Sequence, residues 1–277
     1  KAYITHLAYE LPCQRVENPV GRLRKKTGIR ARHITSADET AGDLAARVAE
    51  KLFATGVDRQ NVDFLLLGTQ SPDYLVPTTA CILQNRLGLS SDCGAMDFNL
   101  GCSGYVYGLG LAKGLIETGQ ARCVLLLTSE TYSKYIHPRD GATSVLFGDG
   151  ATATLIERRT VACPGIYGMT YGTDGRGAKE LIVPIGGSRH PYATATVEEM
   201  VDVHGNYRTN RNLYMNGSAI MNFALDVVPK GLDEVLKKGC LRKEDIDYYV
   251  FHQANRFMLN YLQQECGLSD KPYWNDV

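Results

Sequence analysis

The sequence has no long hydrophobic run, no excess of one charge and no leader-like start. No apolar run in its 277 residues approaches the ~20 needed to span a bilayer, and the first residues, KAYITHLAYELP, do not resemble a signal peptide. Thirty basic residues balance thirty acidic ones, so neither nucleic acid nor an anionic membrane is expected as a partner. We therefore expect a cytoplasmic protein.

Clustered cysteine motifs are also absent. The eight cysteines form no CxxC pair, and no His and Cys residues have the close spacing of a zinc site, so we expect no bound metal. Most of them lie in apolar runs, as Cys123 does in ARCVLLLTS, and a free cysteine often serves as a small core residue. We expect reduced thiols, which leaves room for one reactive cysteine.

A nucleotide-binding motif is missing as well. The segment FGDGATATLIE at 147–157 has closely spaced glycines, but it has neither GxGxxG nor the Lys-Ser/Thr of a phosphate-binding loop. It predicts a tight turn that leads into a strand. We therefore expect no nucleotide to bind at this segment.

What the sequence does contain is an alternation of apolar runs and amphipathic helices. The runs are too continuous for strands with one face in water, and they suit a sheet covered on both faces. The alternation predicts an α/β architecture with a largely parallel sheet. Expected strands are 62–68, 95–100 and 123–128, and expected helices are 40–54, 78–87 and 105–118.

The chain repeats one pattern. The helices expected at 40–54 and 219–238 are each followed by glycine, a polar loop and an apolar–Asp–aromatic triplet, VDF at 62–64 and IDY at 246–248. This predicts two related α/β halves, residues 1–156 and 157–277. By the same count, the counterpart of the NLGCSG loop (99–104) falls beyond Val277, so we expect an incomplete C-terminal end. The abrupt sequence around Pro19 predicts a second short gap near 18–19.

Cys102, in NLGCSG, is the candidate nucleophile. It follows the apolar run AMDFNL and precedes a helix rich in glycine and alanine. That context places its thiol at a helix N-terminus, where free N–H groups favour the thiolate and lower the pKa. A core cysteine packed at a βα turn is the alternative, and the local pattern leaves both readings open.

His252 is the candidate partner among six histidines. It ends the expected strand DYYVF and begins the polar group HQAN. Ligands of parallel α/β sheets bind at the carboxyl ends of strands, and Cys102 is expected at the comparable end in the first half. A Cys–His site built from both halves follows. The pattern also allows a surface or helix-capping histidine.

Taken together, these segments resemble the β-ketoacyl-[acyl-carrier-protein] synthase III family of the thiolase superfamily. The resemblance rests on KTGIRARHI (26–34), SPDYLVPTTACILQNRLG (71–88), GAMDFNLGCSGYVYGL (94–109), VLFGDGATA (145–153), YMNGSAIMNFA (214–224) and VFHQAN (250–255). It implies a thiolase-like, five-layered αβαβα fold made of two duplicated halves, in a protein that is usually a homodimer.

The resemblance also implies a reaction. Cys102 would take an acyl group from acyl-CoA, and neutral His252 would donate a hydrogen bond during decarboxylative condensation with malonyl-acyl-carrier protein, which initiates fatty acid synthesis. CoA and phosphopantetheine thioesters would be substrates rather than cofactors. A second donor, an Asn in a Tyr-Gly-Asn-Thr-Ser-like loop, is expected beyond Val277. The expected substrate and carrier contacts are Asn255, Arg256, Lys26, Gly217 and Val76.

Three positions depart from the family pattern. Phe257 stands where members commonly have Arg on the carrier-protein and CoA contact surface, and the neighbouring Arg256 would point about 100° away on a helix. Lys26 replaces an Arg, which keeps the charge but loses bidentate phosphate binding. Val76 replaces a Phe that reaches the partner's acyl pocket in some members, so we expect a roomier pocket.

Three further readings stay open. The basic residues Arg24, Lys25, Lys26, Arg30 and Arg32 either meet the phosphates of CoA or an acidic carrier protein, or form a solvated charged strip. A condensing enzyme of secondary metabolism, or an acyltransferase or thioesterase-like relative, would use the same Cys–His pair. A non-catalytic subunit of a biosynthetic complex is the other rival, although such a subunit would need neither Cys102 nor His252.

Overall fold

The computed structural model describes residues 1–160 and 165–277. Its contacts divide the chain into two compact units that interleave along the sequence. The first unit is made of Lys1–Arg15, His33–Thr131 and Gly148–Tyr167, and the second of Val16–Arg32, Tyr132–Phe147 and Gly168–Val277. These units are defined by contacts, whereas the predicted halves, 1–156 and 157–277, were defined by a repeated sequence pattern. The boundary between the halves stays a prediction.

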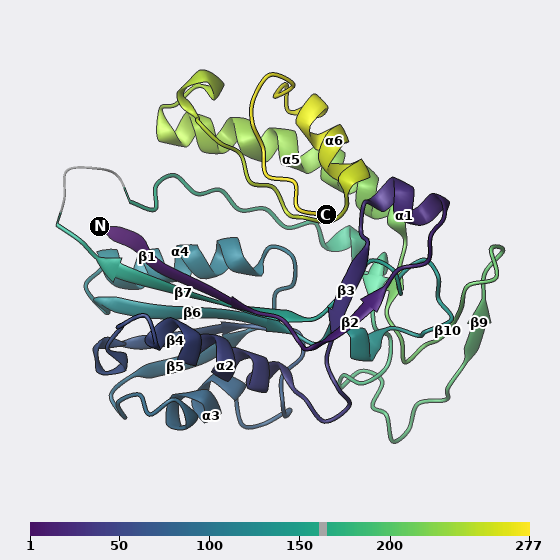
Figure 1. Cartoon of the computed structure of the whole chain (residues 1–277), viewed down its shortest axis with the longest axis horizontal. Helices are drawn as coiled ribbons and strands as arrows, with labels where there is room; N and C mark the ends of the chain where they lie inside the picture. Colours follow the sequence, from purple (N-terminus) through teal and green to yellow (C-terminus); the bar gives the residue numbers. More distant parts are fainter. Residues whose placement is uncertain (161–164) are drawn as a thin grey trace. The chain divides into compact units, whose positions relative to one another are not determined.

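The first unit is built around one five-stranded sheet with helices on both faces (Figure 1). The strand order is β1-β7-β6-β4-β5. Strand β4 pairs in parallel with β5 on one side and with β6 on the other. Strand β7 is antiparallel to both of its neighbours, β6 and β1. The elements are β1 Ala2–Glu10, α2 Ala41–Phe53, β4 Phe64–Gly68, α3 Thr79–Arg86, β5 Gly94–Phe98, α4 Gly104–Glu117, β6 Cys123–Glu130 and β7 Gly150–Arg158.

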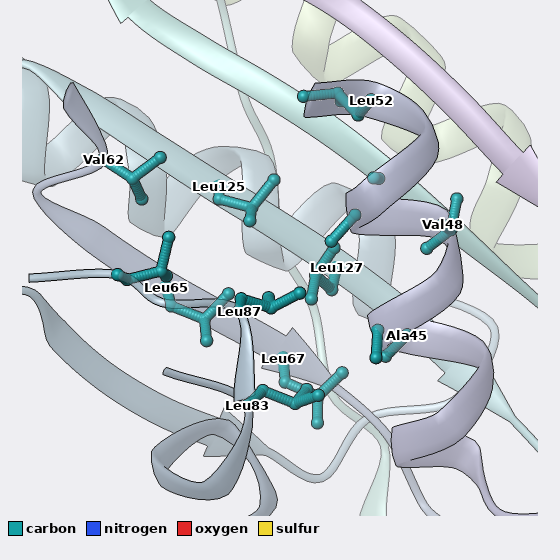
Figure 2. Packing of buried hydrophobic residues seen from close by; sticks show 14 of the residues in the cluster. Ala45, Val48, Leu52, Val62, Leu65, Leu67, Leu83, Leu87, Leu125 and Leu127 are labelled. Atoms are coloured by element: carbon teal, nitrogen blue, oxygen red, sulfur yellow. The ribbon is translucent and has the colours of Figure 1, made fainter. Parts of the chain in front are cut away.

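Alternate side chains of the central strands β4 and β6 pack into two separate hydrophobic cores, one on each face of the sheet. Leu65 and Leu67 of β4 pack with helices α2 and α3 on one face, as Figure 2 shows, while Leu66 packs with α4 on the other. Strand β6 divides its apolar residues in the same way. Because successive strand residues point to opposite faces, an unbroken apolar run is what a doubly covered sheet requires.

Helices α2 and α3 begin at residues whose backbone N–H groups are satisfied by side chains. The hydroxyl of Thr40 accepts a hydrogen bond from the backbone N–H of Asp43, whose carboxylate in turn accepts from the N–H of Thr40, so that α2 opens with a full capping box. Helix α3 is held at its start by a strand residue: Asp97 of β5 accepts from the N–H groups of Thr79 and Ala80 at 2.8 and 2.7 Å. These bonds fix the carboxyl edge of the sheet.

The second unit contains long helix α5, helix α6 and several short elements (Figure 1). Helices α5 and α6 pack together, and a small core of Tyr249, Cys266 and Leu268 lies beneath them. The remaining bounds are β2 Gln14–Glu17, α1 Arg22–Thr27, β3 Ala31–Ile34, β8 Leu181–Ile182, β9 Glu199–Val201, β10 Tyr207–Thr209, β11 Tyr214–Met215, α5 Gly217–Gly239 and α6 Arg256–Glu265. The pairs β2–β3, β9–β10 and β8–β11 each form a two-stranded sheet.

The structure corrects three details of the sequence prediction. The sheet of the first unit is mixed rather than largely parallel, because the long segment between β6 and β7 returns the chain antiparallel to β6. The expected strand DYYVF forms only one parallel bridge, between Tyr249 and Tyr273, so within the described residues it has no ladder to extend it. The turn lies before the FGDG segment rather than in it, at 141–146, while the strand predicted to follow it, β7, does begin at Gly150.

Among the helices in the described ranges, none is both long and apolar enough to cross a membrane.

Candidate active site

Cys102 lies in a tight turn between β5 and α4. The N–H of Gly104 donates to the carbonyl of Gly101 at 2.7 Å, which closes the turn with Cys102 and Ser103 at its centre. Ser103 is the N-cap of α4 and makes no side-chain cap bond, while the Cys102 side chain is exposed. The motif prediction of a thiol at a helix start is thus confirmed as local structure, and the core-cysteine reading does not fit an exposed side chain.

The electrostatics at Cys102 differ from the sequence expectation. Its own backbone N–H favours the thiolate, but desolvation by the surrounding protein is the larger effect and raises the pKa of the Cys102 thiol, with the negative charge of Glu130 adding to the rise. The helix start therefore does not lower the pKa overall, because partial desolvation of the thiol outweighs the one N–H that favours the thiolate. The thiolate is the minor form at neutral pH.

Helix α4 lies close on the sheet because it carries glycine where it meets β6. A Cβ on Gly108 would come within 2.5 Å of Leu126 and 3.0 Å of Phe98. Gly108 is buried, whereas Gly114 further along the helix faces open space. The glycines that weaken α4 as a helix therefore serve close approach at Gly108, as the sequence predicts for a buried helix.

Glu130 is the residue of this region that the sequence reasoning missed. It is the last residue of β6, and its carboxylate accepts hydrogen bonds from the backbone N–H of Gln70 at 2.7 Å and from the hydroxyl of Ser71 at 2.8 Å. Burial, the larger cause, and the charge of Asp149 together raise the pKa of Glu130 to about 7, against the effect of those two bonds. The available signal was a carboxylate placed directly after the buried strand CVLLLTS.

His252 belongs to the second unit, between the Tyr249 bridge and helix α6. Its side chain is exposed, and desolvation nevertheless lowers the pKa of the imidazole below its ordinary value of 6.5. The neutral ring, which carries one N–H donor and one acceptor nitrogen, is thus the main form at neutral pH. A neutral imidazole can donate a hydrogen bond to a developing oxyanion.

Asn255 caps helix α6. Its side-chain oxygen accepts from the N–H of Met258 at 2.9 Å, and its backbone is extended, as an N-cap requires. The cap uses the amide oxygen, so the amide NH₂ is the group left for any ligand. Asn255 thus has a structural role as the cap of α6, and the substrate or carrier contact expected for it stays a prediction.

Arg256 and the basic residues near TGI line one hollow of the second unit. Its volume is about 300 Å³, and Arg24, Lys25, Arg30 and Arg256 contribute to its wall together with Val20, Gly21 and Gly28. The Arg256 guanidinium donates to the carbonyl of Val277 at 3.0 Å and lies against Gly28. Arg32 is committed elsewhere, to Asn18 and to the carbonyl of Phe147.

Lys26 and Phe257, two of the residues that depart from the family pattern, are in contact with each other. The Lys26 ammonium lies 4.0 Å from the centre of the Phe257 ring, within the range of a cation–π interaction. The side chain of Lys26, expected to face substrate, thus rests on helix α6. The lysine and phenylalanine that stand where two arginines were expected form one packed pair.

The other two expected contacts are exposed. Gly217 is the first residue of α5, and a Cβ there would meet nothing within 4 Å. Val76 is 83% exposed and Leu75 92%, in the loop between β4 and α3. The roles expected for both residues stay predictions.

Comparisons with known proteins address the family. Residues 96–175 match the family model for 3-oxoacyl-[acyl-carrier-protein] synthase III, another name for the β-ketoacyl enzymes. A β-ketoacyl-[acyl-carrier-protein] synthase III of Caldanaerobacter subterraneus subsp. tengcongensis is 38% identical over 252 residues, which are 90% of this chain and 73% of the relative. The chain belongs to the 3-oxoacyl-[acyl-carrier-protein] synthase III family.

Solved structures of 3-oxoacyl-(acyl-carrier-protein) synthases, one of them a synthase III, agree with this assignment. One crystal structure is 48% identical with a TM-score of 0.96, covering 99% of this chain and 84% of that chain. The enzyme from Burkholderia xenovorans LB400 is 34% identical with a TM-score of 0.85, covering all of this chain and 80% of the other. The predicted thiolase-like α/β fold class is confirmed, and the chain is an acyl-transferring condensing enzyme of this family.

Proposed function

We propose that the chain condenses an acyl group taken from acyl-CoA with malonyl-acyl-carrier protein through an acyl-cysteine at Cys102, as the first condensation of fatty acid synthesis. The observation that carries the proposal is an exposed thiol in the turn that opens α4, inside the segment that matches the family model. The substrates are thioesters, and no cofactor is required.

The first step is a thioester exchange. The Cys102 thiolate attacks the acyl carbonyl carbon, an S–C bond forms, the C–S bond to CoA breaks, and CoA leaves as a thiolate that takes up a proton. The backbone N–H of Cys102, at the start of α4, is placed to donate to the oxyanion of the tetrahedral intermediate. The raised pKa of Cys102 means that only a minor thiolate fraction reacts at any moment.

The second step forms the carbon–carbon bond. Decarboxylation of the malonyl group leaves its electron pair on an enolate, which attacks the acyl carbon while the bond to Cys102 breaks and the thiolate is regenerated. Neutral His252 donates a hydrogen bond to the enolate oxygen, and its lowered pKa supports that role. The enolate oxygen needs donors that carry no acidic proton to quench it, and a neutral imidazole meets that need.

The basic hollow is the proposed contact for the phosphates of CoA or for the acidic carrier protein. Lys25 and Arg30 are exposed there, and Arg256 adds a third cation from helix α6. Charge-reversing Lys25→Glu and Arg30→Glu variants are expected to raise KM for the carrier protein and to weaken its salt dependence, with kcat changed less. An unchanged KM would favour the solvated-strip interpretation.

Val76 is the proposed determinant of acyl length. The exposed segment at 74–76 supports a role at the surface of a second copy of the chain in a homodimer. With valine rather than phenylalanine, the pocket accepts branched or longer acyl groups. Rates with acetyl-CoA and longer acyl-CoA thioesters test this, and a strict preference for acetyl-CoA would contradict it.

Two variants separate the two steps. Cys102→Ala is expected to abolish CoA release and product formation, whereas His252→Ala is expected to release CoA yet form no β-ketoacyl product. Cys81→Ala, which changes another exposed cysteine, serves as the matched control and should keep both activities. If His252→Ala still decarboxylates malonyl-carrier protein, the role given to His252 is wrong.

A further inference from the structure

The proposed reaction leaves the buried carboxyl of Glu130 unused, although it lies at the same edge of the sheet as the nucleophile. Gly68 of β4 is paired with Thr128 of β6 on one side and with Phe98 of β5 on the other. All three strands run in the same direction, so their carboxyl ends share one edge. Glu130 is two residues beyond Thr128, and the turn that holds Cys102 follows Phe98.

The Glu130 side chain is directed across the end of β4. Its two oxygens accept from the N–H of Gln70 and the hydroxyl of Ser71, both in the segment that leaves β4. The Ser71 hydroxyl is buried and also accepts from the N–H of Thr131, which ties the two strand ends together. Since β4 lies between β6 and β5, a side chain that reaches over β4 points toward the β5 side, where Cys102 stands.

Two charged or ionisable groups interact with this carboxyl in addition to its neutral hydrogen-bond donors. The negative charge of Asp149, just before β7, raises the pKa of Glu130. The negative charge of Glu130 in turn raises the pKa of Cys102 in the β5–α4 turn. Asp149 is itself buried and accepts from the N–H and hydroxyl of Thr35, both at 2.8 Å. From β4, the groups that face Glu130 are the uncharged Gln70 and Ser71.

We propose that Glu130 is a positioning residue whose charge restrains the Cys102 thiolate, so that acyl loading rises less steeply with pH across neutrality. The inference rests on the proposed role of Cys102 as the nucleophile. When the carboxyl is protonated, Cys102 ionises beside a neutral neighbour. When the carboxyl is ionised, the thiolate forms beside a like charge in a site of reduced dielectric, which costs free energy.

The coupling has a recognisable signature. Below pH 7, thiolate reactivity rises about tenfold per pH unit, as for any thiol below its pKa. As Glu130 loses its proton near its pKa of about 7, the rise flattens, and it resumes once the carboxyl is fully ionised. A single uncoupled thiol gives no such step.

The experiment measures alkylation of Cys102 by iodoacetamide between pH 5.5 and 9.5, with peptide mass analysis to separate Cys102 from the other exposed cysteines. Glu130→Gln is expected to remove the flattening and to react about tenfold faster than the unchanged protein above pH 8. Glu117→Gln makes the same change at the far end of α4, and it should keep the original profile. Coinciding profiles for Glu130→Gln and the unchanged protein would overturn the proposal.

Asp149→Asn provides a second, independent variant. Because Asp149 raises the pKa of Glu130, its loss should move the flattening to lower pH without removing it. A flattening that stays in place would contradict the proposal even if Glu130→Gln failed to fold. Alkylation needs no acyl-CoA, so failure of acyl loading would refute the proposed function while leaving this test valid.

Discussion

Single residues at the edge of the first-unit sheet show how burial can outweigh local backbone effects. At Cys102, one N–H favours the thiolate, yet desolvation and the charge of Glu130 together raise the thiol pKa. At Glu130, two hydrogen bonds favour the carboxylate, yet burial raises its pKa to about 7. The thiol and the carboxyl therefore both stay protonated to a higher pH than they would in water.

The raised pKa of Glu130 predicts a specific pH dependence of stability. The unfolded chain ionises Glu130 near pH 4.5, while the folded chain holds the proton until about pH 7, so this residue's contribution is full below 4.5 and lost as pH rises through 7. The loss corresponds to about 3 kcal/mol for a shift of this size. Thermal midpoints measured from pH 4 to 8 should fall more for the unchanged protein than for Glu130→Gln.

Glu117 is the matched control for that measurement. A hydrogen bond from Lys113 lowers the pKa of Glu117, so its contribution has the opposite sign and disappears as pH falls through the folded pKa. Glu117→Gln should therefore leave the alkaline part of the curve unchanged. If both variants flatten the curve between pH 5 and 8 alike, the effect does not come from the burial of Glu130.

The lowered pKa of His252 predicts the acid limb of the condensation step. Because the pKa of His252 lies below its ordinary value of 6.5, the rate of condensation from preloaded enzyme should fall on the acid side with a midpoint below pH 6.5. Preloading separates this limb from the ionisation of Cys102. A limb whose midpoint lies above pH 6.5 would show that His252 is not the titrating donor or that it acts in another protonation state.

At the scale of elements, caps and close packing position the candidate residues. Helix α6 begins at the residue after Asn255, and α4 begins two residues after Cys102, so each helix start orients a segment of the expected site. The absence of a side chain at Gly108 lets α4 pack closely against Leu126 of β6. These contacts can be tested separately from the chemistry.

Asn255→Ala should lower the free energy of unfolding by about 1 kcal/mol, because the N–H of Met258 loses its acceptor at the start of α6. Asn255→Asp, which keeps an acceptor at the cap, should restore most of that stability. Denaturant unfolding gives both values. A stability of Asn255→Ala equal to that of the unchanged protein would refute the capping role.

Gly108→Ala should destabilise the fold by about 1–3 kcal/mol, because its methyl group would overlap Leu126 and push α4 away from the sheet. Gly114→Ala lies on the same helix with open space around it, and it should stabilise the fold by up to about 1 kcal/mol. Urea unfolding of both variants tests the packing. Equal effects would mean that helix propensity, rather than contact with β6, governs α4.

Apolar runs and cap residues predicted most helices and strands of the first unit. They could not predict which strands pair with one another in the sheet. The runs at 62–68, 95–100 and 123–128 became β4, β5 and β6, and Thr40 capped α2 as expected. Strand β1 was missed because a register shift between Ile4 and His6 interrupts its alternation. The direction of β7 depends on a long irregular connection, on which the apolar pattern carries no information.

At the scale of the whole molecule, the repeat and the motifs predicted family and fold class, but the site's electrostatics needed coordinates. The helix–loop–triplet pattern reappears in the structure, since a 3₁₀ turn precedes the triplet in both copies, at Arg59–Asn61 and Lys243–Asp245. The NLGCSG motif identified Cys102. Glu130 escaped notice because its influence depends on β6 ending beside β4, a contact between residues distant in sequence.

The most direct test of the account is the mass of the protein after incubation with acyl-CoA. We predict that it increases by one acyl group, that peptide mapping assigns the group to the segment around Cys102, and that Cys102→Ala acquires no such mass. Cys81→Ala should be acylated like the unchanged protein. A protein that remains unmodified, or one whose acyl group persists in Cys102→Ala, would contradict the claim that Cys102 is the nucleophile.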